Sequence, residues 1–420
     1  MAFSLNGYEW LLRGVVELLD LFPPRRLEKE EIHLRKGGYE PPAPIEQGTI
    51  WVHGASLGEV ITLRPFLNQL SRVVGKDRLV ASATTMDGYR RLVDDGLCGH
   101  ATLLPIELPE YLGPFLTRMK PRLLLISETE IWPLLLATLG RRGIPYGIIN
   151  ARINERTVRF MRLLRPLFQE AIDHLAFVYP QDQVYARRFQ RLGVPAARIT
   201  PLGCFKYDIE PGPCDVAALR VKYGIPPGRQ VWCFGSTHAG EEKLILEALD
   251  PLWKGLNVTV VIAPRKIDRV AEIERSLQQR HLDVARLSDR RRPASHLLLV
   301  DSLGVLRELY AISSLAFVGG SLVEHGGHNL MEPAAYAVPI VTGPHTWNFP
   351  SEREALREAG ALFEVTDAAS LRQVLAEAVV DPARFLAAGR QARAVLDRMA
   401  GASRRTVAAL RQSGYLADAA

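Results

Sequence analysis

Short apolar runs alternate with helix-type patterns along most of the chain. In the first half, strand-type runs cover residues 49–53, 79–83, 101–104, 123–126, 146–149 and 175–178. Strands that alternate with helical segments are typical of a parallel sheet covered by helices on both faces. The pattern therefore predicts an α/β fold of the doubly wound type.

The alternation is interrupted at residues 209–214, where the sequence reads Ile-Glu-Pro-Gly-Pro-Cys, and then restarts. Strand-type runs follow at residues 230–234, 258–263, 297–300, 315–318 and 340–342, and the chain from Ala368 onward reads as helix. A length of 420 residues exceeds what one hydrophobic core usually supports. We expect two Rossmann-like doubly wound domains, at residues 23–208 and 209–400, followed by a helical tail at 401–420.

Two similar segments open the two halves. Residues 51–59 read WVHGASLGE, and residues 232–241 read WCFGSTHAGE. Each passes from a strand through a glycine and a hydroxyl residue into Gly-Glu and a helix. Because ligands of open α/β sheets bind beyond the carboxyl ends of the strands, we expect both loops to face one central cleft.

The N-terminal segment, residues 1–22, predicts an amphipathic helix. Residues 10–22 are mostly apolar, but Arg13, Glu17 and Asp20 recur at helical spacing. The segment is too short and too charged to span a bilayer, and it lacks the features of a signal peptide. One interpretation is a helix in the membrane interface, anchored by Trp10 and Phe22. The alternative is a helix packed on its own domain.

Composition and charge narrow the class of protein. The chain has 47% hydrophobic and 23% charged residues, an ordinary globular balance, and its net charge of +6 favours anionic partners. The four cysteines lack the spacing of a disulfide framework or a metal site, so we expect reduced thiols in a cytosolic protein. The ten histidines form no HExxH-type motif, and we expect no metal.

A glycine-rich segment lies between residues 315 and 349. An apolar run ends in Gly319-Gly320, a second pair at Gly326-Gly327 precedes His328-Asn329, and residues 330–337 read as helix. Such a turn aims backbone N–H groups and a helix N-terminus at one point, where a phosphate fits. Glu332 would then accept hydrogen bonds from a ribose hydroxyl. A tight turn without a ligand is the alternative.

Glu59 is the first candidate for acid–base chemistry. It stands at a helix start after Gly58, where the helix dipole favours its ionised form and a substrate has room to approach. Those features suit a general base. However, Ser56 and Glu59 also fit a capping box, which would occupy the carboxylate with backbone donors.

Three further charged residues follow predicted strands or close the first domain. Ser127 and Glu130 fit a second capping box, which leaves Glu128 as the carboxylate without a local partner. Lys206, beside the domain boundary, would stabilise departing negative charge or pair with Asp208. Arg265 ends a strand and would grip a phosphate or a base edge.

A basic segment lies at residues 151–165, with arginines at 152, 156, 159, 162 and 165. Their three- and four-residue steps predict one helix face. Solvation alone explains such a face, but beside an interfacial N-terminus it favours an anionic membrane surface or lipid phosphates. No nucleic-acid-binding module is present, so nucleic acid is not the expected partner.

Taken together and in order, these motifs resemble the bacterial 3-deoxy-D-manno-octulosonic acid (Kdo) transferases. The resemblance covers nearly the whole chain. It rests on GASLGE (54–59), SETEIWP (127–133), NARI (150–153), GCFKYD (203–208), GSTHAGEE (235–242), APR (263–265), DSLG (301–304), FVGGSLVEHGGHN (317–329) and GPHTWNF (343–349).

The resemblance implies a GT-B glycosyltransferase of the inner-membrane cytoplasmic face that moves Kdo from CMP-Kdo to the lipid A precursor in lipopolysaccharide synthesis. It implies Glu59 as proton acceptor, Glu128 and Lys206 as transition-state stabilisers, and inversion by direct attack. The CMP-contacting positions that it implies are Pro264, Arg265, Leu303, Gly304, Val305, Asn329, Leu330, Met331 and Glu332. No cofactor or metal is implied.

Several positions depart from the family pattern. Lys266 stands where the family usually has His, Val305 where it often has an acidic residue, and Leu330-Met331 where it has Pro-Leu. These departures concern the nucleotide contacts more than the reaction class. An envelope glycosyltransferase with a UDP-sugar donor is one alternative. A non-enzymatic membrane-surface protein is another, but it would have no need of Glu59, Glu128 and Lys206 together.

Overall fold

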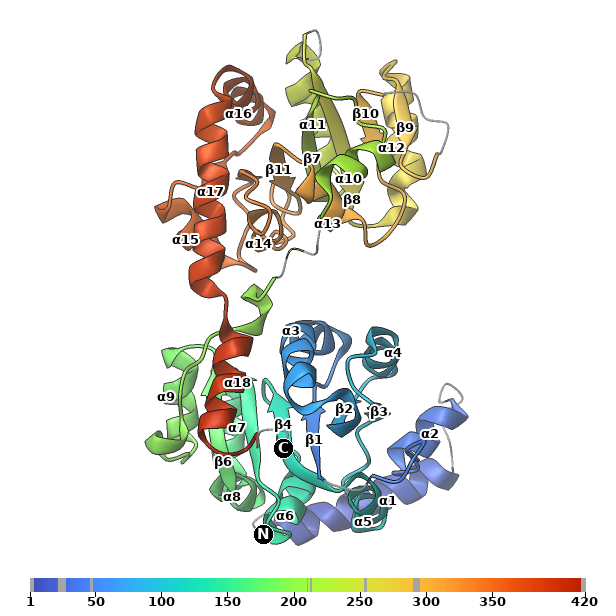
Figure 1. Cartoon of the computed structure of the whole chain (residues 1–420), viewed down its shortest axis with the longest axis vertical. Helices are drawn as coiled ribbons and strands as arrows, with labels where there is room; N and C mark the ends of the chain where they lie inside the picture. The colour runs from blue at the N-terminus through green and yellow to red at the C-terminus, as the bar shows by residue number, and fades with distance from the viewer. Residues whose placement is uncertain are drawn as a thin grey trace. The chain divides into compact units, whose positions relative to one another are not determined.

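The computed structural model describes residues 4–21, 28–45, 48–209, 211, 214–252, 255–289 and 295–416. The chain divides into two compact units. Unit 1 comprises Met1–Asp208 and Ala400–Ala420, and unit 2 comprises Ile209–Met399. Each unit is an α/β structure in its own right (Figure 1).

Unit 1 is built on a six-stranded sheet of order β3-β2-β1-β4-β5-β6, and every pairing in it is parallel. Its strands are β1 (Thr49–His53), β2 (Leu79–Ala83), β3 (His100–Leu103), β4 (Pro121–Ser127), β5 (Tyr146–Ala151) and β6 (Leu175–Pro180). Its helices are α1 (Leu5–Leu21), α2 (Lys29–Arg35), α3 (Leu57–Val74), α4 (Met86–Asp95), α5 (Pro109–Met119), α6 (Pro133–Arg141), α7 (Glu155–Leu163), α8 (Arg165–Asp173), α9 (Gln183–Arg191) and α18 (Ala402–Gln412), with short 3-10 turns at Lys76–Arg78, Ala196–Arg198 and Phe205–Tyr207.

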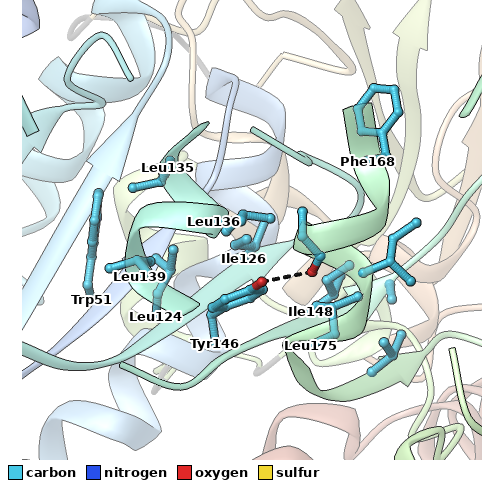
Figure 2. Close-up of a cluster of buried hydrophobic side chains, with 14 of the residues drawn as sticks. Trp51, Leu124, Ile126, Leu135, Leu136, Leu139, Tyr146, Ile148, Phe168 and Leu175 are labelled. Carbon is cyan, nitrogen blue, oxygen red and sulfur yellow. Dashed lines mark hydrogen bonds between the residues drawn. The ribbon is translucent and has the colours of Figure 1, made fainter. Parts of the chain in front are cut away.

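Alternate residues of each strand in unit 1 enter two different cores. Trp51, Leu124 and Tyr146 face a core closed by α5, α6 and α8, and the Tyr146 hydroxyl donates to the carbonyl oxygen of Ala171 at 2.8 Å (Figure 2). Ile50 and Leu125 face the opposite core, closed by α3, α4 and α18. Because side chains alternate along a strand, both faces must be covered, and apolar runs are the result.

Helix α18 completes the second of these cores, although it is the last helix along the chain. Val407 and Leu410 pack into the core lined by α3. The Asp208 carboxylate fixes the start of this helix by accepting from the backbone N–H groups of Gly401, Ala402 and Ser403 at 2.5, 3.2 and 2.6 Å. The C-terminal tail is therefore an integral part of unit 1.

Unit 2 is built on a seven-stranded parallel sheet of order β13-β12-β11-β7-β8-β10-β9. Its strands are β7 (Gln230–Thr237), β8 (Val258–Pro264), β9 (Val284–Arg286), β10 (Leu297–Leu299), β11 (Leu315–Val318), β12 (Ile340–Thr342) and β13 (Leu362–Glu364). Its helices are α10 (Val216–Lys222), α11 (Glu241–Leu249), α12 (Val270–Gln279), α13 (Leu306–Ala311), α14 (Met331–Ala334), α15 (Pro350–Glu358), α16 (Ala368–Val380) and α17 (Pro382–Met399), with 3-10 turns at Asp250–Leu252 and Ile267–Arg269.

The predicted fold class is confirmed. Each strand-type run of the sequence overlaps a strand, and several match it residue for residue, as β1, β2 and β11 do. The short strands β9 and β13, at the two edges of the second sheet, were not predicted. The chain reverses its direction of winding around β7, whose neighbours are β11 and β8, and such a switch point is where ligands of open sheets bind.

Candidate active site

An open pocket of ≈ 380 Å³ lies in unit 1, beyond the carboxyl ends of β4 and β5 and beside the start of α3. Its lining is mostly polar. The residues around it are Glu59, Glu128, Thr129, Glu130, Arg152, Ile153, Asn154, Thr157, Tyr185 and Arg188. Two of the three residues predicted to be catalytic, Glu59 and Glu128, thus line the same pocket, although they lie 69 positions apart in the sequence.

Glu59 serves as a cap and also lines the pocket. Its Oε2 accepts from the Ala55 N–H at 3.0 Å, and its own N–H donates to Ser56 Oγ at 3.4 Å. Burial raises the pKa of Glu59, the Ala55 N–H lowers it, and the negative charge of Glu128 raises it. The carboxylate thus caps the start of α3 and at the same time has a raised pKa, so capping does not rule out the general-base role.

Glu128 is held in an unusual position by Arg152. Its φ of 60° lies in the left-handed region, which costs a residue with a Cβ atom about 1–2 kcal/mol. Arg152 Nε donates to Glu128 Oε2 at 2.6 Å, and the Glu128 side chain is only 13% exposed. Glu128 has no partner in its own motif, as expected, and its partner Arg152 lies instead at the end of the neighbouring strand.

The predicted capping box of Ser127 and Glu130 does not form. Helix α6 begins at Pro133 with Trp132 as its N-cap, so neither residue stands at a helix start. The Ser127 hydroxyl is buried without a hydrogen-bond partner in the described part of the chain. Glu130 lines the pocket instead, and is a third carboxylate that sequence reasoning assigned to a merely local role.

Lys206 lies in the 3-10 turn Phe205–Tyr207 and is not one of the residues that line the pocket. Its Nζ is 5.2 Å from the centre of the Tyr207 ring. The Asn150 side chain, at the end of β5, accepts from the Phe205 N–H at 3.1 Å and so ties this turn to the sheet. Asp208, the ion-pair partner considered for Lys206, caps α18 instead.

In unit 2, the predicted nucleotide contacts come from three loops. Arg265 directly follows β8, and its N–H donates to the Thr237 carbonyl oxygen at 2.9 Å. Leu303, Gly304 and Val305 precede α13, where Leu303 is 78% exposed and Gly304 has a φ of 83°. Burial raises the pKa of Glu332, and the positive charges of Arg307 and Arg265 oppose that rise.

The first glycine pair does not offer free N–H groups to a phosphate. The buried Glu241 carboxylate accepts from the N–H groups of Gly320, Ser321 and Leu322 at 2.7, 3.0 and 2.9 Å, and from His238 N–H at 2.9 Å. A protein carboxylate thus occupies the anion position that the sequence suggests for a ligand. Sequence reasoning missed Glu241, whose only signal was the repeated Gly-Glu after a strand.

The helix expected at residues 330–337 is also shorter than predicted. Helix α14 covers only Met331–Ala334, and the backbone has left the helical region by Ala337, whose φ is 55°. Asn329 Oδ1 accepts from the Met331 N–H at 3.0 Å. Within the described residues, the N–H groups of His328, Asn329 and Leu330 have no acceptor. An anion bound by this loop would therefore accept hydrogen bonds from these three N–H groups.

Histidines gather beside that loop, although their sequence spacing shows no motif. The His238 ring stacks on His325 with centroids 4.1 Å apart, and His238 Nε2 lies 2.8 Å from His328 Nε2. Within the described ranges, no three His, Cys, Asp or Glu side chains are arranged to hold a metal ion. None of the four cysteines, all of which lie in the described ranges, forms a disulfide.

Helix α1 packs on unit 1 and also exposes an apolar face. Val16 is buried against Leu108 and Leu134, and the Tyr8 hydroxyl donates to Glu107 Oε1 at 2.6 Å. On the other side, Trp10, Leu11, Leu18 and Leu21 are 81%, 56%, 60% and 72% exposed. Phe22 lies outside the described residues. No helix in the described part of the chain is long and apolar enough to cross a bilayer.

The basic segment is not one helix. Arg152 precedes α7, which Asn154 caps by accepting from the Thr157 N–H at 2.7 Å, and Arg165 begins α8. Helix α7 itself carries exposed arginines at 156, 159 and 162, with Phe160 and Leu163 exposed by 53% and 80%. This surface combines positive charge with apolar side chains.

Comparisons with known proteins point to one family. Residues 29–209 match the family described as 3-deoxy-D-manno-octulosonic-acid transferase (kdotransferase). A 3-deoxy-D-manno-octulosonic acid transferase of Haemophilus influenzae is 31% identical over 379 residues, covering 88% of this chain and 88% of that protein. A protein of the same name from Bordetella pertussis is also 31% identical, over 96% of this chain and 98% of its own length.

Among solved structures, the chain resembles UDP-GlcNAc 2-epimerase from Neisseria meningitidis bound to UDP-GlcNAc. The TM-score is 0.59 and the identity 14%, over 87% of this chain and 100% of that one. At this identity the likeness shows the fold alone, and it supports the expected GT-B class.

Proposed function

Because this chain belongs to the Kdo transferase family, a family of glycosyltransferases, we propose that it moves Kdo from CMP-Kdo to the lipid A precursor with inversion at the anomeric carbon. The observation that carries the proposal is the position of Glu59. Its carboxylate lies at a helix start in an open pocket, with a raised pKa and a neighbouring carboxylate that is fixed by an arginine.

Glu59 is the general base in this account. In a single displacement, the acceptor hydroxyl loses its proton to Glu59, and its oxygen forms the new bond to the anomeric carbon. The bond from that carbon to the phosphate oxygen breaks, and its electron pair leaves with CMP. One base and one direct attack give inverted stereochemistry. The raised pKa of Glu59 suits it to this step better than an exposed glutamate.

Glu128 and Lys206 stabilise the charges that develop. The anomeric centre becomes oxocarbenium-like as the phosphate leaves, and a fixed carboxylate such as Glu128 offsets that positive charge. The 2.6 Å contact with Arg152 holds Glu128 in place before the reaction, which supports such a role. Lys206 offsets the negative charge of the departing CMP.

Unit 2 binds the donor. Arg265 and the N–H groups of His328, Asn329 and Leu330 receive the single phosphate, and Glu332 accepts hydrogen bonds from the ribose. Residues 303–305 contact the base. Three N–H groups without an acceptor support the phosphate position, because such groups readily bind anions.

The transfer needs no divalent cation in this proposal. CMP-Kdo has one phosphate, and the arginine and N–H groups of unit 2 offset its charge. Full activity in excess EDTA is the expected result. Loss of activity in EDTA that returns with Mg²⁺ would overturn this part of the proposal.

The acceptor is reached at the cytoplasmic face of the inner membrane. The exposed apolar face of α1 inserts into the interface, and the arginines of α7 bind lipid phosphates. Helix α7 begins at the pocket, because Asn154 and Thr157 are among the residues that line the pocket. A phosphorylated lipid bound along α7 would therefore have its sugar near Glu59.

Product analysis tests the proposal. The protein is incubated with freshly generated CMP-Kdo and the tetra-acylated lipid A precursor, and the product is examined by mass spectrometry and by NMR of the new linkage. We expect one or more Kdo units added with inverted configuration. Inhibition by CMP and CTP but not by UDP would exclude a UDP-sugar donor, and the reverse pattern would refute CMP-Kdo as the substrate.

A further inference from the structure

Glu130 is a pocket carboxylate to which the proposed mechanism gives no task. It lies in the loop between β4 and α6, with its side chain 28% exposed. It lines the same pocket as Glu59 and Glu128. Among the described residues, the basic side chain that comes within 4.0 Å of its carboxylate is His53 at the end of β1, whose Nε2 lies 4.0 Å from Glu130 Oε2.

A chain of hydrogen bonds fixes the orientation of His53. Trp51 Nε1 donates to Ser82 Oγ at 2.7 Å, and His53 Nδ1 lies 2.8 Å from the same oxygen. The Ser82 oxygen accepts from the indole N–H and also contacts His53 Nδ1, so these two contacts hold the imidazole with its Nε2 on the side of Glu130.

His53 gives Glu130 a neutral neighbour instead of a cation. The ring is fully buried, and this burial lowers the pKa of His53 to about 4. At neutral pH the ring therefore carries no full positive charge beside Glu130. The Thr84 hydroxyl, 3.4 Å from His53 Nε2, is the other polar group at this end of the ring.

The cations of the pocket are engaged elsewhere. Arg152 contacts Glu128 at 2.6 Å, and Arg188 donates to the Ile153 carbonyl oxygen at 2.8 Å. Glu130 therefore faces two carboxylates, from α3 and from the end of β4, and Tyr185 of α9 completes the titratable groups around the pocket. Burial, followed by repulsion from Glu59, raises the pKa of Glu130 to about 7.

We propose that Glu130 is a positioning residue that sets the basicity of Glu59, and that the two carboxylates titrate as one coupled pair whose proton resides on Glu130. This inference rests on the proposed function, in which Glu59 is the base. Two carboxylates that share a site lose their protons in separate steps. In the first step Glu59 ionises and becomes the base, and in the second step Glu130 ionises. When Glu130 ionises, its charge makes Glu59 a stronger base.

Kinetics give the first test. The pH dependence of kcat/KM reports groups of the free enzyme. We expect wild type to show a second rise near pH 7, which Glu130→Gln abolishes because glutamine mimics the protonated form. The two enzymes should agree within about threefold at pH 6 and differ by roughly fivefold or more at pH 8.5. A variant that is slower by the same factor at every pH, or that keeps the rise, would overturn the proposal.

A titration without substrate gives the second test and separates the two claims. In protein labelled with ¹³C at the glutamate carboxyls, the Glu130 signal is identified by its loss in Glu130→Gln. We expect a midpoint near 7 in wild type and a lower midpoint in Glu59→Gln, where the repelling charge is gone. An unchanged midpoint would disprove the coupling. Absence of Kdo transfer by wild type would count against the proposed function, and this titration would still decide the coupling.

Discussion

Arg152 Nε and Glu128 Oε2 are 2.6 Å apart, and this contact joins the loop after β5 to the left-handed residue that follows β4. The sequence places these residues in separate motifs. Among the described residues, however, theirs is the only ion pair shorter than 4.0 Å that joins two residues lining the pocket. Glu128 thereby acquires a fixed position before any substrate binds.

Replacing Arg152 with Met tests the importance of this contact. We expect turnover to fall by roughly 10- to 100-fold, since a misplaced charge near the reacting centre is costly. The free energy of unfolding should fall by no more than about 2 kcal/mol, because Arg152 is 57% exposed, although Glu128, which is 13% exposed, loses its partner. Arg141→Met on α6 removes an exposed pair with Glu170 at a side chain that is 62% exposed, and this control should retain turnover. Equal losses in both variants would contradict the role of Arg152.

Two substitutions beside Glu59 should shift the pH dependence of kcat/KM in opposite directions. Glu59 is active as a base only when ionised, so kcat/KM falls as the pH drops through its pKa. The charge of Glu128 raises that pKa, and the charge of Arg152 lowers it. Glu128→Gln should therefore move the acid limb to lower pH, and Arg152→Met should move it to higher pH. Shifts in the same direction would contradict Glu59 as the group observed.

Much of the fold was predictable, because each buried strand must be apolar on both faces and reads as a continuous run. Strand β1 illustrates this, since Ile50 and Trp51 enter different cores. Edge strands β9 and β13 escaped prediction because they are only three residues long and partly exposed. The docking of α18 on unit 1 depends on Asp208, a contact across 193 positions that no local pattern encodes.

The site was predictable in part for the same reason. Glu59 and Glu128 follow strands, and parallel strands bring their carboxyl ends together, so their shared pocket follows from the topology. Glu130 and Glu241 were missed or given local roles. Glu130 fits a capping motif whose helix begins three residues later, and Glu241 meets its donors across about 80 positions. A local motif does not contain the distant residues that surround a side chain in the fold, so it could not reveal these positions.

The Glu241 carboxylate should be a main determinant of stability in unit 2. Glu241→Ala leaves at least three buried N–H groups without an acceptor, which we expect to lower the free energy of unfolding by about 3 kcal/mol or more. Glu247→Ala, on the exposed side of the same helix, should change it by no more than about 0.5 kcal/mol. Hydrogen exchange at the amides of β7 and β11 would locate the effect. Equal protection in both variants would refute this role.

Membrane binding should depend on the exposed face of α1. Substituting Trp10 and Leu18 together with Glu removes two apolar side chains that are 81% and 60% exposed. We expect binding to anionic vesicles to fall at least tenfold in flotation assays, while turnover of a detergent-dispersed acceptor stays within about twofold. The control substitutes Val93 and Val221 with Glu, at comparable exposures of 53% and 81%. Unchanged vesicle binding by the α1 variant would exclude this helix as the anchor.

The most direct test of the account compares wild type with Glu59→Gln in Kdo transfer from CMP-Kdo to the lipid A precursor, with CMP binding measured by calorimetry on both proteins. We expect transfer by wild type and a loss of roughly 100-fold or more in the variant, because a general base contributes that much. The CMP affinities of the two proteins should be equal, because Glu59 lies in unit 1 and the proposed nucleotide contacts lie in unit 2. Transfer by Glu59→Gln at a near wild-type rate, or none by folded wild type that binds CMP, would contradict the account.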